Sequence, residues 1–354
     1  MATGLYIGST SPYAGKNMLS LGIGLRLQKE GLRLGYMKPV GAVPGEHEDT
    51  MVDEDACFVQ EVLGLEQPKD LVNPVLITQD FKMRAFSGQE DNHLERIGKA
   101  YKTLSANTDM MLVSGSGHMI SGKYCGLDSF KIIQELGLKV VVIDRLNFEL
   151  NYDVLIAYKE ALGDAMLGAV INDIPASFMN EVTSVVQPFL ERKGIPVLGI
   201  LPHDPLMSSI CATDLARCLG GRLVTAQEKA NGMVESFLIG TMQVENFMTH
   251  FRRHSNAAVL VGGDRADVQL VAIEGNCPCI VLTGNLYPND IILSRAETLG
   301  VPIIMVRDDT YSVAKKMEAL LTRHKLRDII KIRQGAQLIS ANLDFIALRK
   351  GLGL

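Results

Sequence analysis

Several features that mark whole classes of protein are missing from the sequence. No apolar run approaches the roughly 20 residues that a membrane-spanning helix needs, which argues against an integral membrane protein. Acidic residues outnumber basic ones by 40 to 35, and the net charge of −5 argues against nucleic acid or an anionic membrane surface as a main partner. The first residues do not form a basic, apolar leader, so we expect no secretory signal.

The six cysteines form neither a disulfide framework nor the pattern of a metal site. They are scattered along the chain, mostly inside apolar segments. Cys277-Pro-Cys279 is the only close pair, and no second pair or histidine cluster completes a zinc site. We therefore expect reduced, mostly buried thiols in a cytoplasmic protein.

What the sequence does contain is a glycine-bracketed stretch near its start, GLYIGSTSPYAGKN, at residues 4–17. The apolar run Leu5–Ile7 predicts a strand, and apolar residues at helical spacing after Lys16 predict a helix. Gly8 and Gly15 bracket the loop between them. In such an arrangement, backbone N–H groups of the loop and of the helix start face an anion, and the lysine adds a positive charge. The stretch therefore predicts a phosphate site.

This loop departs from the standard phosphate-binding pattern in two ways. Six residues separate Gly8 from Gly15, where the pattern has four. Asn17 stands where a Ser or Thr hydroxyl would bind magnesium, although an amide oxygen can also bind that ion. A strand-to-helix turn that needs glycine only for its conformation remains the alternative.

The rest of the first 220 residues alternates short β-branched runs with helical patterns. This rhythm predicts an α/β fold, in which helices cover both faces of a parallel sheet. Polar residues follow several of the strands, where open α/β sheets bind ligands. Residues 41–51 read as a polar loop, and residues 68–92, which lack a clear pattern, could close over a substrate. The predicted strands are 5–7, 32–37, 110–113, 139–143, 167–171 and 196–201.

Because 354 residues exceed what one core usually supports, we expect two domains. The alternation restarts near residue 220, which predicts a second, smaller α/β domain over 221–325 after a first domain over 1–220. Residues 326–354 read as an amphipathic tail. The second domain has predicted strands at 257–262, 279–283 and 302–306 and predicted helices at 266–274, 289–299 and 313–321.

Two known families resemble the two predicted domains. Residues 1–215 resemble dethiobiotin synthetase and related P-loop proteins, which implies a P-loop NTPase-type sheet, and residues 221–320 are similar to the DRTGG domain. This domain order resembles the N-terminal half of long-form bacterial phosphotransacetylase without its acetyl-transferring domain, so we do not expect phosphotransacetylase activity from this chain alone. The motifs that carry the DRTGG resemblance are Gly263-Asp264-Arg265, Val281-Leu282-Thr283-Gly284-Asn285 and Val306-Arg307-Asp308-Asp309-Thr310-Tyr311-Ser312.

The resemblance implies that the glycine-bracketed loop holds the phosphates of a nucleotide, most simply ATP. By this resemblance Gly8, Thr10, Gly15 and Lys16 contact the phosphates. Asn17 takes the position of the residue that helps bind Mg²⁺.

The resemblance also assigns residues outside the loop. Lys38 falls where the synthetase uses a lysine against its carboxylate substrate, and Asn172 where an asparagine contacts adenine. Asp53 and Asp55 lie where aspartate helps bind Mg²⁺. Ser114 replaces a glutamate of the metal site, and losing that carboxylate removes a charged oxygen ligand.

Structural roles are the alternatives for several of these residues. Asp53 and Asp55 open a predicted helix, where carboxylates favour the helix dipole whatever the function. Asn172 could equally cap the segment that follows it. Four further polar residues lie in the predicted cleft. We expect His203 to order its loop, a structural role is the alternative for His118, and Asp128 and Asp144 have no assigned role.

Because two metal-binding groups of the resembled enzyme are replaced here, catalysis should suffer more than binding. We therefore expect a cytoplasmic, nucleotide-binding regulatory protein, dimeric through its second domain and acting on a protein partner. The first alternative is an active ATP- and Mg²⁺-dependent synthetase, in which Lys16 and Lys38 stabilise phosphoryl transfer to a carboxylate or carbamate. The second is a scaffold that binds no nucleotide.

Overall fold

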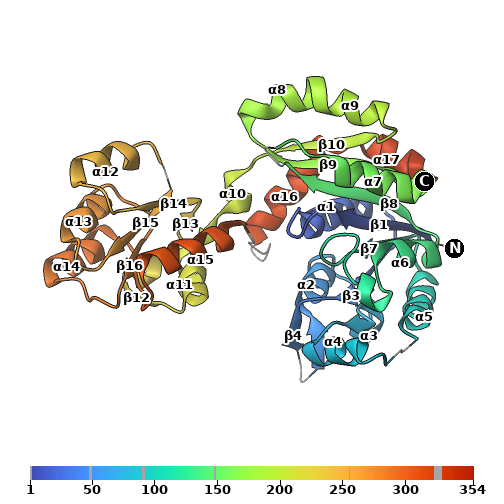
Figure 1. Ribbon diagram of the computed structural model, residues 1–354, viewed down its shortest axis with the longest axis horizontal. Coiled ribbons are helices and arrows are strands. Elements are labelled where there is room, and N and C mark those ends of the chain that lie inside the picture. Colours follow the sequence, from blue (N-terminus) through green and yellow to red (C-terminus); the bar gives the residue numbers. More distant parts are fainter. Residues whose placement is uncertain (1, 48–49, 90–91, 147–148, 255, 323–328) are drawn as a thin grey trace. The chain divides into compact units, whose positions relative to one another are not determined.

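The computed structural model describes residues 2–47, 50–89, 92–146, 149–254, 256–322 and 329–354. The chain forms two compact units (Figure 1). Unit 1 contains residues 1–203 and 326–354, and unit 2 contains residues 204–325. The boundary that the sequence predicts near residue 220 thus lies at residue 203, and the predicted tail belongs to unit 1.

A six-stranded sheet forms the centre of unit 1, in the order β10-β9-β8-β1-β7-β2. Each neighbouring pair of strands is parallel. The strands are almost entirely apolar, because helices cover both faces of the sheet. All six predicted strands are present, which confirms the α/β class. They are β1 (Thr3–Ser9), β2 (Leu34–Met37), β7 (Met110–Ser114), β8 (Lys139–Arg145), β9 (Met166–Ile174) and β10 (Val197–Pro202).

Alternate side chains of the sheet pack against different helices. Tyr6 and Val113 face one side and share a core with Ile97 and Ile133 of the helices there. Leu112 faces the other side, where Gly24 brings α1 so close that a Cβ would lie 3.1 Å from the leucine Cδ1. The main helices of residues 1–203 are α1 (Lys16–Lys29), α2 (Glu54–Val62), α5 (His93–Ser105), α6 (Ser129–Leu136), α7 (Asp153–Leu162), α8 (Met179–Glu181) and α9 (Gln187–Arg192).

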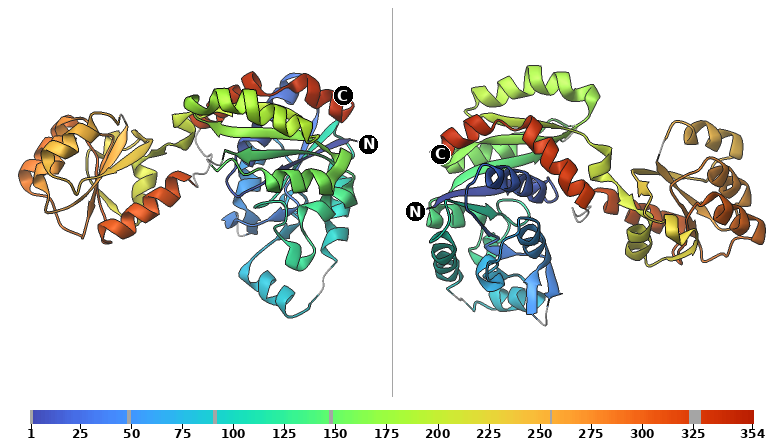
Figure 2. Two further views of the ribbon diagram at one scale, coloured as in Figure 1. Left: turned by 45° about the horizontal axis from the view of Figure 1, so that its top comes forward. Right: turned by 180° about the vertical axis from the view of Figure 1, so that it is seen from behind.

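The C-terminal stretch forms α16 (Ile329–Asn342) and α17 (Phe345–Leu352), which pack on unit 1. Figure 2 shows these two helices (red) beside α1 (dark blue). Gly22 makes the close approach possible, since a Cβ there would lie 2.6 Å from the Cβ of Ile339. The N–H of Asp344 also donates to the Leu198 carbonyl at 2.7 Å, which ties the helices to the edge strand.

Two segments predicted as loops contain regular structure. The polar segment 41–51 contributes to an antiparallel hairpin of β4 (Pro44–His47) and β5 (Thr50–Asp53). The segment 68–92 contains α3 (Lys69–Val72), β6 (Val75–Leu76), which pairs with β3 (Val40–Gly41), and α4 (Gln79–Phe86). These elements are too short for hydrophobic periodicity to reveal them.

Unit 2 has a five-stranded sheet in the order β12-β17-β16-β15-β14. β12 is antiparallel to its neighbour, and the other pairs are parallel. The three predicted strands are β15, β16 and β17, whereas β12 and β14 are less buried and were not predicted. The strands are β12 (Arg222–Thr225), β14 (Ser236–Ile239), β15 (Ala257–Gly262), β16 (Ile280–Thr283) and β17 (Ile303–Met305), and β11 (Ile210–Cys211) pairs with β13 (Met233–Val234).

The helices of unit 2 confirm the three that the sequence predicts and add others. Leu215 and Leu219 of α11 pack with Val281 of the sheet, which is why residues 204–219 belong to this unit. The helices are α10 (Pro205–Ser208), α11 (Ala212–Leu219), α12 (Val244–Phe251), α13 (Ala266–Glu274), α14 (Asp290–Leu299) and α15 (Thr310–Thr322). Within the described part of both units, no helix combines the length and apolar character needed to cross a bilayer.

Candidate functional site

The glycine-bracketed loop connects the end of β1 to the first residue of α1, Lys16. Gly15 adopts a φ of 111°, which other residues rarely accept, and a Cβ there would lie 2.6 Å from Asn172 Nδ2. No side chain among the described residues caps the N-terminus of α1. Its first N–H groups and the positive end of its dipole are therefore available to an anion.

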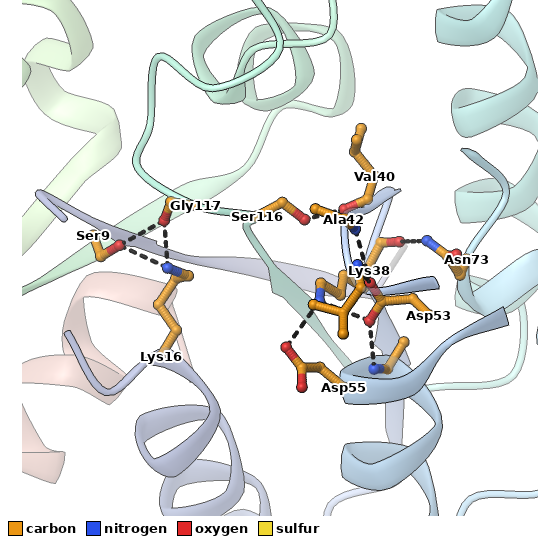
Figure 3. A network of polar contacts seen from close by, with 12 residues as sticks. Ser9, Lys16, Lys38, Val40, Ala42, Asp53, Asp55, Asn73, Ser116 and Gly117 are labelled. Atoms are coloured by element: carbon orange, nitrogen blue, oxygen red, sulfur yellow. Dashed lines mark hydrogen bonds and ion pairs between the residues drawn. The ribbon is translucent and has the colours of Figure 1, made fainter. Parts of the chain in front are cut away.

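The side chain of Lys16 turns toward neutral oxygens rather than toward a carboxylate (Figure 3). Its Nζ donates to Ser9 Oγ at 2.8 Å and to the carbonyl of Gly117. Burial, followed by the positive charge of nearby Lys38, lowers the pKa of Lys16 to about 8. A bound anion would oppose both effects, so the loop holds a cation that lacks a full counter-charge.

Thr10, predicted to contact phosphate, donates its hydroxyl hydrogen bond to Asp144 Oδ1. Asp144 lies at the end of β8 and is 8% exposed. Burial raises the pKa of this carboxyl to about 6, and the hydrogen bond from Thr10 only partly opposes that rise. The sequence gives Asp144 no role, whereas the structure places it directly against the loop.

Lys38 and Asp53 form a buried ion pair with an Nζ–Oδ1 distance of 2.7 Å (Figure 3). Asp53 Oδ1 also accepts the N–H of Ala56 and so caps α2. Asp53 Oδ2 accepts the N–H groups of Ala42 and Val43, at 2.8 and 3.0 Å. One carboxylate thus joins Lys38, the start of α2 and the loop before the β4–β5 hairpin.

The residues predicted to bind Mg²⁺ are not arranged so that all of them could coordinate one ion directly. Each oxygen of Asp53 already accepts two hydrogen bonds, so a metal ion would have to displace Lys38 or a backbone N–H. Asp55 lies 3.4 Å from Lys38 Nζ and is partly exposed, and Asn17 lies in the first turn of α1. The described residues contain no group of three or more His, Cys, Asp or Glu side chains arranged to hold a metal.

Asn172 lies at the end of β9, where its Nδ2 donates to the Ala14 carbonyl of the loop at 2.8 Å. The next residue, Asp173, has a φ of 67° and bonds to both Arg145 and His203. Burial alone would raise the pKa of Asp173, but the hydrogen bond from His203 and the charge of Arg145 lower it on balance. His203, predicted to order its loop, is therefore tied to the residue beside Asn172.

The remaining predicted residues lie around the same end of the sheet. Gly8 faces Met119, whose Sδ would lie 2.8 Å from an added Cβ. Ser114, at the end of β7, is buried. His118 contacts Ser121 rather than the glycine-bracketed loop. Sequence reasoning assigned no role to Ser9, the last residue of β1, although it lies inside the glycine-bracketed stretch.

Two families match the chain. The family described as "AAA domain" matches residues 3–210, and the family described as "DRTGG domain" matches residues 214–320. The domain order implied by the sequence resemblance is therefore confirmed.

Curated relatives agree with this order. The phosphate acetyltransferase of Deinococcus radiodurans is 22% identical over 97% of this chain and 50% of its own length, and that of Pseudomonas putida is 24% identical over the same two shares. The ATP-dependent dethiobiotin synthetase of Methanocaldococcus jannaschii is 27% identical over 56% of this chain and 92% of its own length. The chain thus spans about half the length of the phosphate acetyltransferases that it matches.

Similar solved structures include the MinD cell division protein of Aquifex aeolicus, at 15% identity and a TM-score of 0.36. That match covers 58% of this chain and 84% of the MinD chain. The CBS and DRTGG domains of the Clostridium perfringens pyrophosphatase regulatory region are 16% identical, with a TM-score of 0.29, over 43% of this chain and 72% of theirs. At these TM-scores neither match bears on function.

Proposed function

Because the chain belongs to the AAA domain family through residues 3–210, we propose that it is a nucleotide-binding regulatory protein with ATP as its nucleotide. One observation carries the proposal. Lys16, with a pKa near 8, lies at a helix N-terminus that no described side chain caps, and its hydrogen bonds go to neutral oxygens. Such a site is stabilised by an anion, and a phosphate group has the charge and acceptor oxygens that it requires.

In this proposal the phosphates contact the loop and the start of α1. The contacting residues are Gly8, Thr10, Gly15, Lys16 and Asn17. Asn172 contacts the adenine ring at the side of the loop. This contact requires Nδ2 of Asn172 to exchange its hydrogen bond with the Ala14 carbonyl for one with the base.

The proposed regulatory role rests on the burial of Lys38 and on its ion pair with Asp53. The Lys38 side chain is 4% exposed and its ammonium is paired with Asp53, so it is not free to hold a substrate carboxylate. The oxygens of Asp53 are likewise occupied and do not offer a metal ligand. Binding at the loop therefore needs no rearrangement of this pair, whereas phosphoryl transfer that uses Lys38 does.

The rest of the proposal concerns assembly. We take unit 2 to dimerise in the cytoplasm and to transmit nucleotide occupancy to a protein partner. Its DRTGG match supports assigning it a function separate from the nucleotide site. Light scattering at micromolar concentration, with and without ATP, tests the dimer, and a monomer in both conditions would overturn this part.

Calorimetric titration of ATP, with and without Mg²⁺, tests the nucleotide site directly. Lys16→Ala should abolish binding, because it removes the positive charge that faces the phosphates. Lys29→Ala is the matched control, since it removes a lysine from the exposed end of the same helix. Silence from the native chain, or equal binding by both variants, would overturn the nucleotide proposal.

An ATP-dependent synthetase is the second candidate, favoured by the match that covers 92% of a dethiobiotin synthetase. In that case Lys16 and Lys38 would be catalytic and would stabilise phosphoryl transfer to a carboxylate or carbamate. Mg²⁺-dependent release of ADP that disappears in both Lys16→Ala and Lys38→Ala would establish it. Tight binding with negligible turnover supports the regulatory role instead.

A further inference from the structure

Asp144 is a buried carboxylate that lies against the glycine-bracketed loop. β1 and β8 are parallel neighbours, with Ser9 opposite Ile143 (Figure 1). The next residue of each strand end, Thr10 and Asp144, therefore lies at the same carboxyl end of the sheet. The Thr10 N–H donates to the Ile143 carbonyl at 3.3 Å, and the Thr10 hydroxyl donates to Asp144 Oδ1. These two hydrogen bonds hold the carboxylate beside the residues proposed to contact phosphate.

Asp144 has no positively charged partner among the described residues, although it is more than nine-tenths buried. Its neighbour Arg145 pairs with Asp173 instead, at 2.6 Å. The ammonium of Lys16 donates to uncharged oxygens of other residues. A buried charge that lacks a partner costs free energy, so a cation bound at Asp144 would be stabilising.

One oxygen of this carboxylate is available to such a cation. Oδ1 accepts the hydrogen bond from Thr10, whereas Oδ2 accepts none from the described residues. The unpartnered hydroxyls of Tyr36 and Ser114 are sealed from solvent, but Asp144 Oδ2 is not among the sealed unpartnered atoms of the described chain. Mg²⁺ is a hard cation that prefers oxygen ligands, and in nucleotide sites it is usually held by one or two carboxylates together with phosphate oxygens and water.

The charge of Asp144 would oppose a nucleotide that binds without metal. A carboxylate and a phosphate repel each other at short range, and the effect is strong where water is largely excluded. A divalent cation between the two groups attracts both and removes the repulsion. The proposed nucleotide site is therefore complete only when a cation accompanies the phosphates.

We propose that Asp144, rather than Asp53 or Asp55, supplies the protein carboxylate for a Mg²⁺ ion that binds together with the nucleotide phosphates. Thr10 is a positioning residue, because its hydroxyl occupies Oδ1 and leaves Oδ2 for the ion. The oxygens of Asp53, by contrast, are already occupied by Lys38 and by backbone N–H groups. This inference rests on the proposed nucleotide site and names the residue through which that site depends on metal.

Asp144→Asn tests the inference through ATP affinity with and without Mg²⁺, measured by calorimetry at pH 7.5 in Mg²⁺ or in EDTA. In the native chain Mg²⁺ should strengthen ATP binding by about tenfold or more. Without metal the variant should bind ATP about tenfold more tightly than the native chain, because the repulsion is gone, and Mg²⁺ should then add less than about twofold. Loss of an ordinary contact would weaken binding in both conditions instead.

Asp164→Asn is the matched control. It removes an exposed carboxylate from the segment just before β9, at the opposite, amino end of the sheet. Both ATP affinities, with Mg²⁺ and with EDTA, should stay as they are in the native chain.

A change of metal preference separates coordination from charge alone. Asp144→Cys places a thiolate at the same position, and thiolates favour soft ions such as Cd²⁺ over Mg²⁺. ATP binding by this variant should be strengthened by Cd²⁺ and not by Mg²⁺. The native chain titrated with ATP in Cd²⁺ accounts for the six cysteines that it already contains.

Three results would overturn the metal site. Equal strengthening by Mg²⁺ in the native chain and in Asp144→Asn would do so while leaving the nucleotide site intact. Loss of the strengthening in Asp55→Asn, with Asp144→Asn unaffected, would return the ion to the residues first predicted. No ATP binding by any of these chains would overturn the nucleotide site and the metal site together.

Discussion

The two units differ in where they keep their charges. In unit 1, Lys38, Asp53 and Asp144 are at most 8% exposed, and all lie near the carboxyl end of the sheet. In unit 2 the described ion pairs lie on the surface, as in Lys316–Asp308, whose side chains are 52% and 42% exposed. Burying charge costs free energy unless a partner or a ligand compensates. The comparison therefore supports the proposal that places the nucleotide site in unit 1.

The titration behaviour of buried groups supports this contrast. Unit 1 holds a lysine with a pKa of about 8 and an aspartate with a pKa of about 6, both beside the glycine-bracketed loop. In unit 2, burial raises the pKa of the Cys279 thiol to about 12, which keeps it neutral. The buried polar residues described in that unit are also uncharged: Ser209, Thr225, Gln269 and Thr283. Strongly shifted charged groups are typical of functional sites.

Asp53→Ala should give the largest effect. It leaves the Lys38 ammonium buried without its partner and removes the cap of α2, so we expect a loss of roughly 3–5 kcal/mol. Urea unfolding measures the loss, and amide hydrogen exchange in β7 and β16 assigns it to one unit. Asp308→Ala in unit 2 is the control. If the two substitutions lower the free energy of unfolding equally, the buried pair contributes no more to stability than a surface pair.

Asp144→Asn should stabilise unit 1 at neutral pH. The carboxyl pKa is raised from 3.8 to about 6, so the folded state binds more protons between these values and stability falls as pH rises through them. Above pH 6 the penalty is about 3 kcal/mol, at 1.36 kcal/mol per pKa unit. The variant keeps an oxygen that can accept from Thr10 and should remove this pH dependence. Melting curves at pH 4 and pH 7.5 check the result, and a variant that is less stable at both would contradict it.

Nucleotide affinity should fall as pH rises above about 8, where Lys16 in the free protein loses its proton. A bound phosphate favours the charged form, so binding above that pH must take up a proton. Affinity should fall by up to about tenfold per pH unit, and about half a proton should be taken up per nucleotide at pH 8. Calorimetry in buffers of different ionisation enthalpy counts the protons. No proton uptake would mean that Lys16 does not meet the phosphates.

Arg295→Ala in unit 2 should have the smallest effect. Its partner Glu274 lies 2.5 Å away, but the two side chains are 44% and 47% exposed. Water and salt screen such pairs, so we expect almost no change in the free energy of unfolding. Urea unfolding in low and high salt checks it. A loss comparable to that of Asp53→Ala would remove the contrast between the units.

Much of the fold follows from local sequence. Fully buried parallel strands appear as continuous apolar runs, which is why all six strands of the unit 1 sheet could be predicted. β12 and β14 were missed because their short, partly exposed sequences carry no such run. The return of α16 to α1 was also missed. An amphipathic pattern shows that a helix packs, but not on which partner, and the fit of Gly22 to Ile339 is visible only in three dimensions.

The site was predictable to a similar extent. The glycine-bracketed loop and Lys16 belong to one short stretch with a recognisable geometry. The contact of Thr10 with Asp144 joins residues 134 positions apart, so no local pattern contains it. For Asp53 the local pattern is clear but ambiguous, because an acidic residue at the start of a helix can be either a helix cap or a metal ligand. The structure uses it as a cap and as the partner of Lys38.

The return of the chain to unit 1 has a consequence for synthesis on the ribosome. α1, which carries Lys16, is made near the beginning, whereas α16, which packs on it, is made only after all of unit 2. The surface of α1 around Gly22 therefore lacks its contact with α16 while unit 2 is translated. Slowed elongation or a nascent-chain chaperone should thus affect the folding of the nucleotide unit more than that of the unit inserted within it.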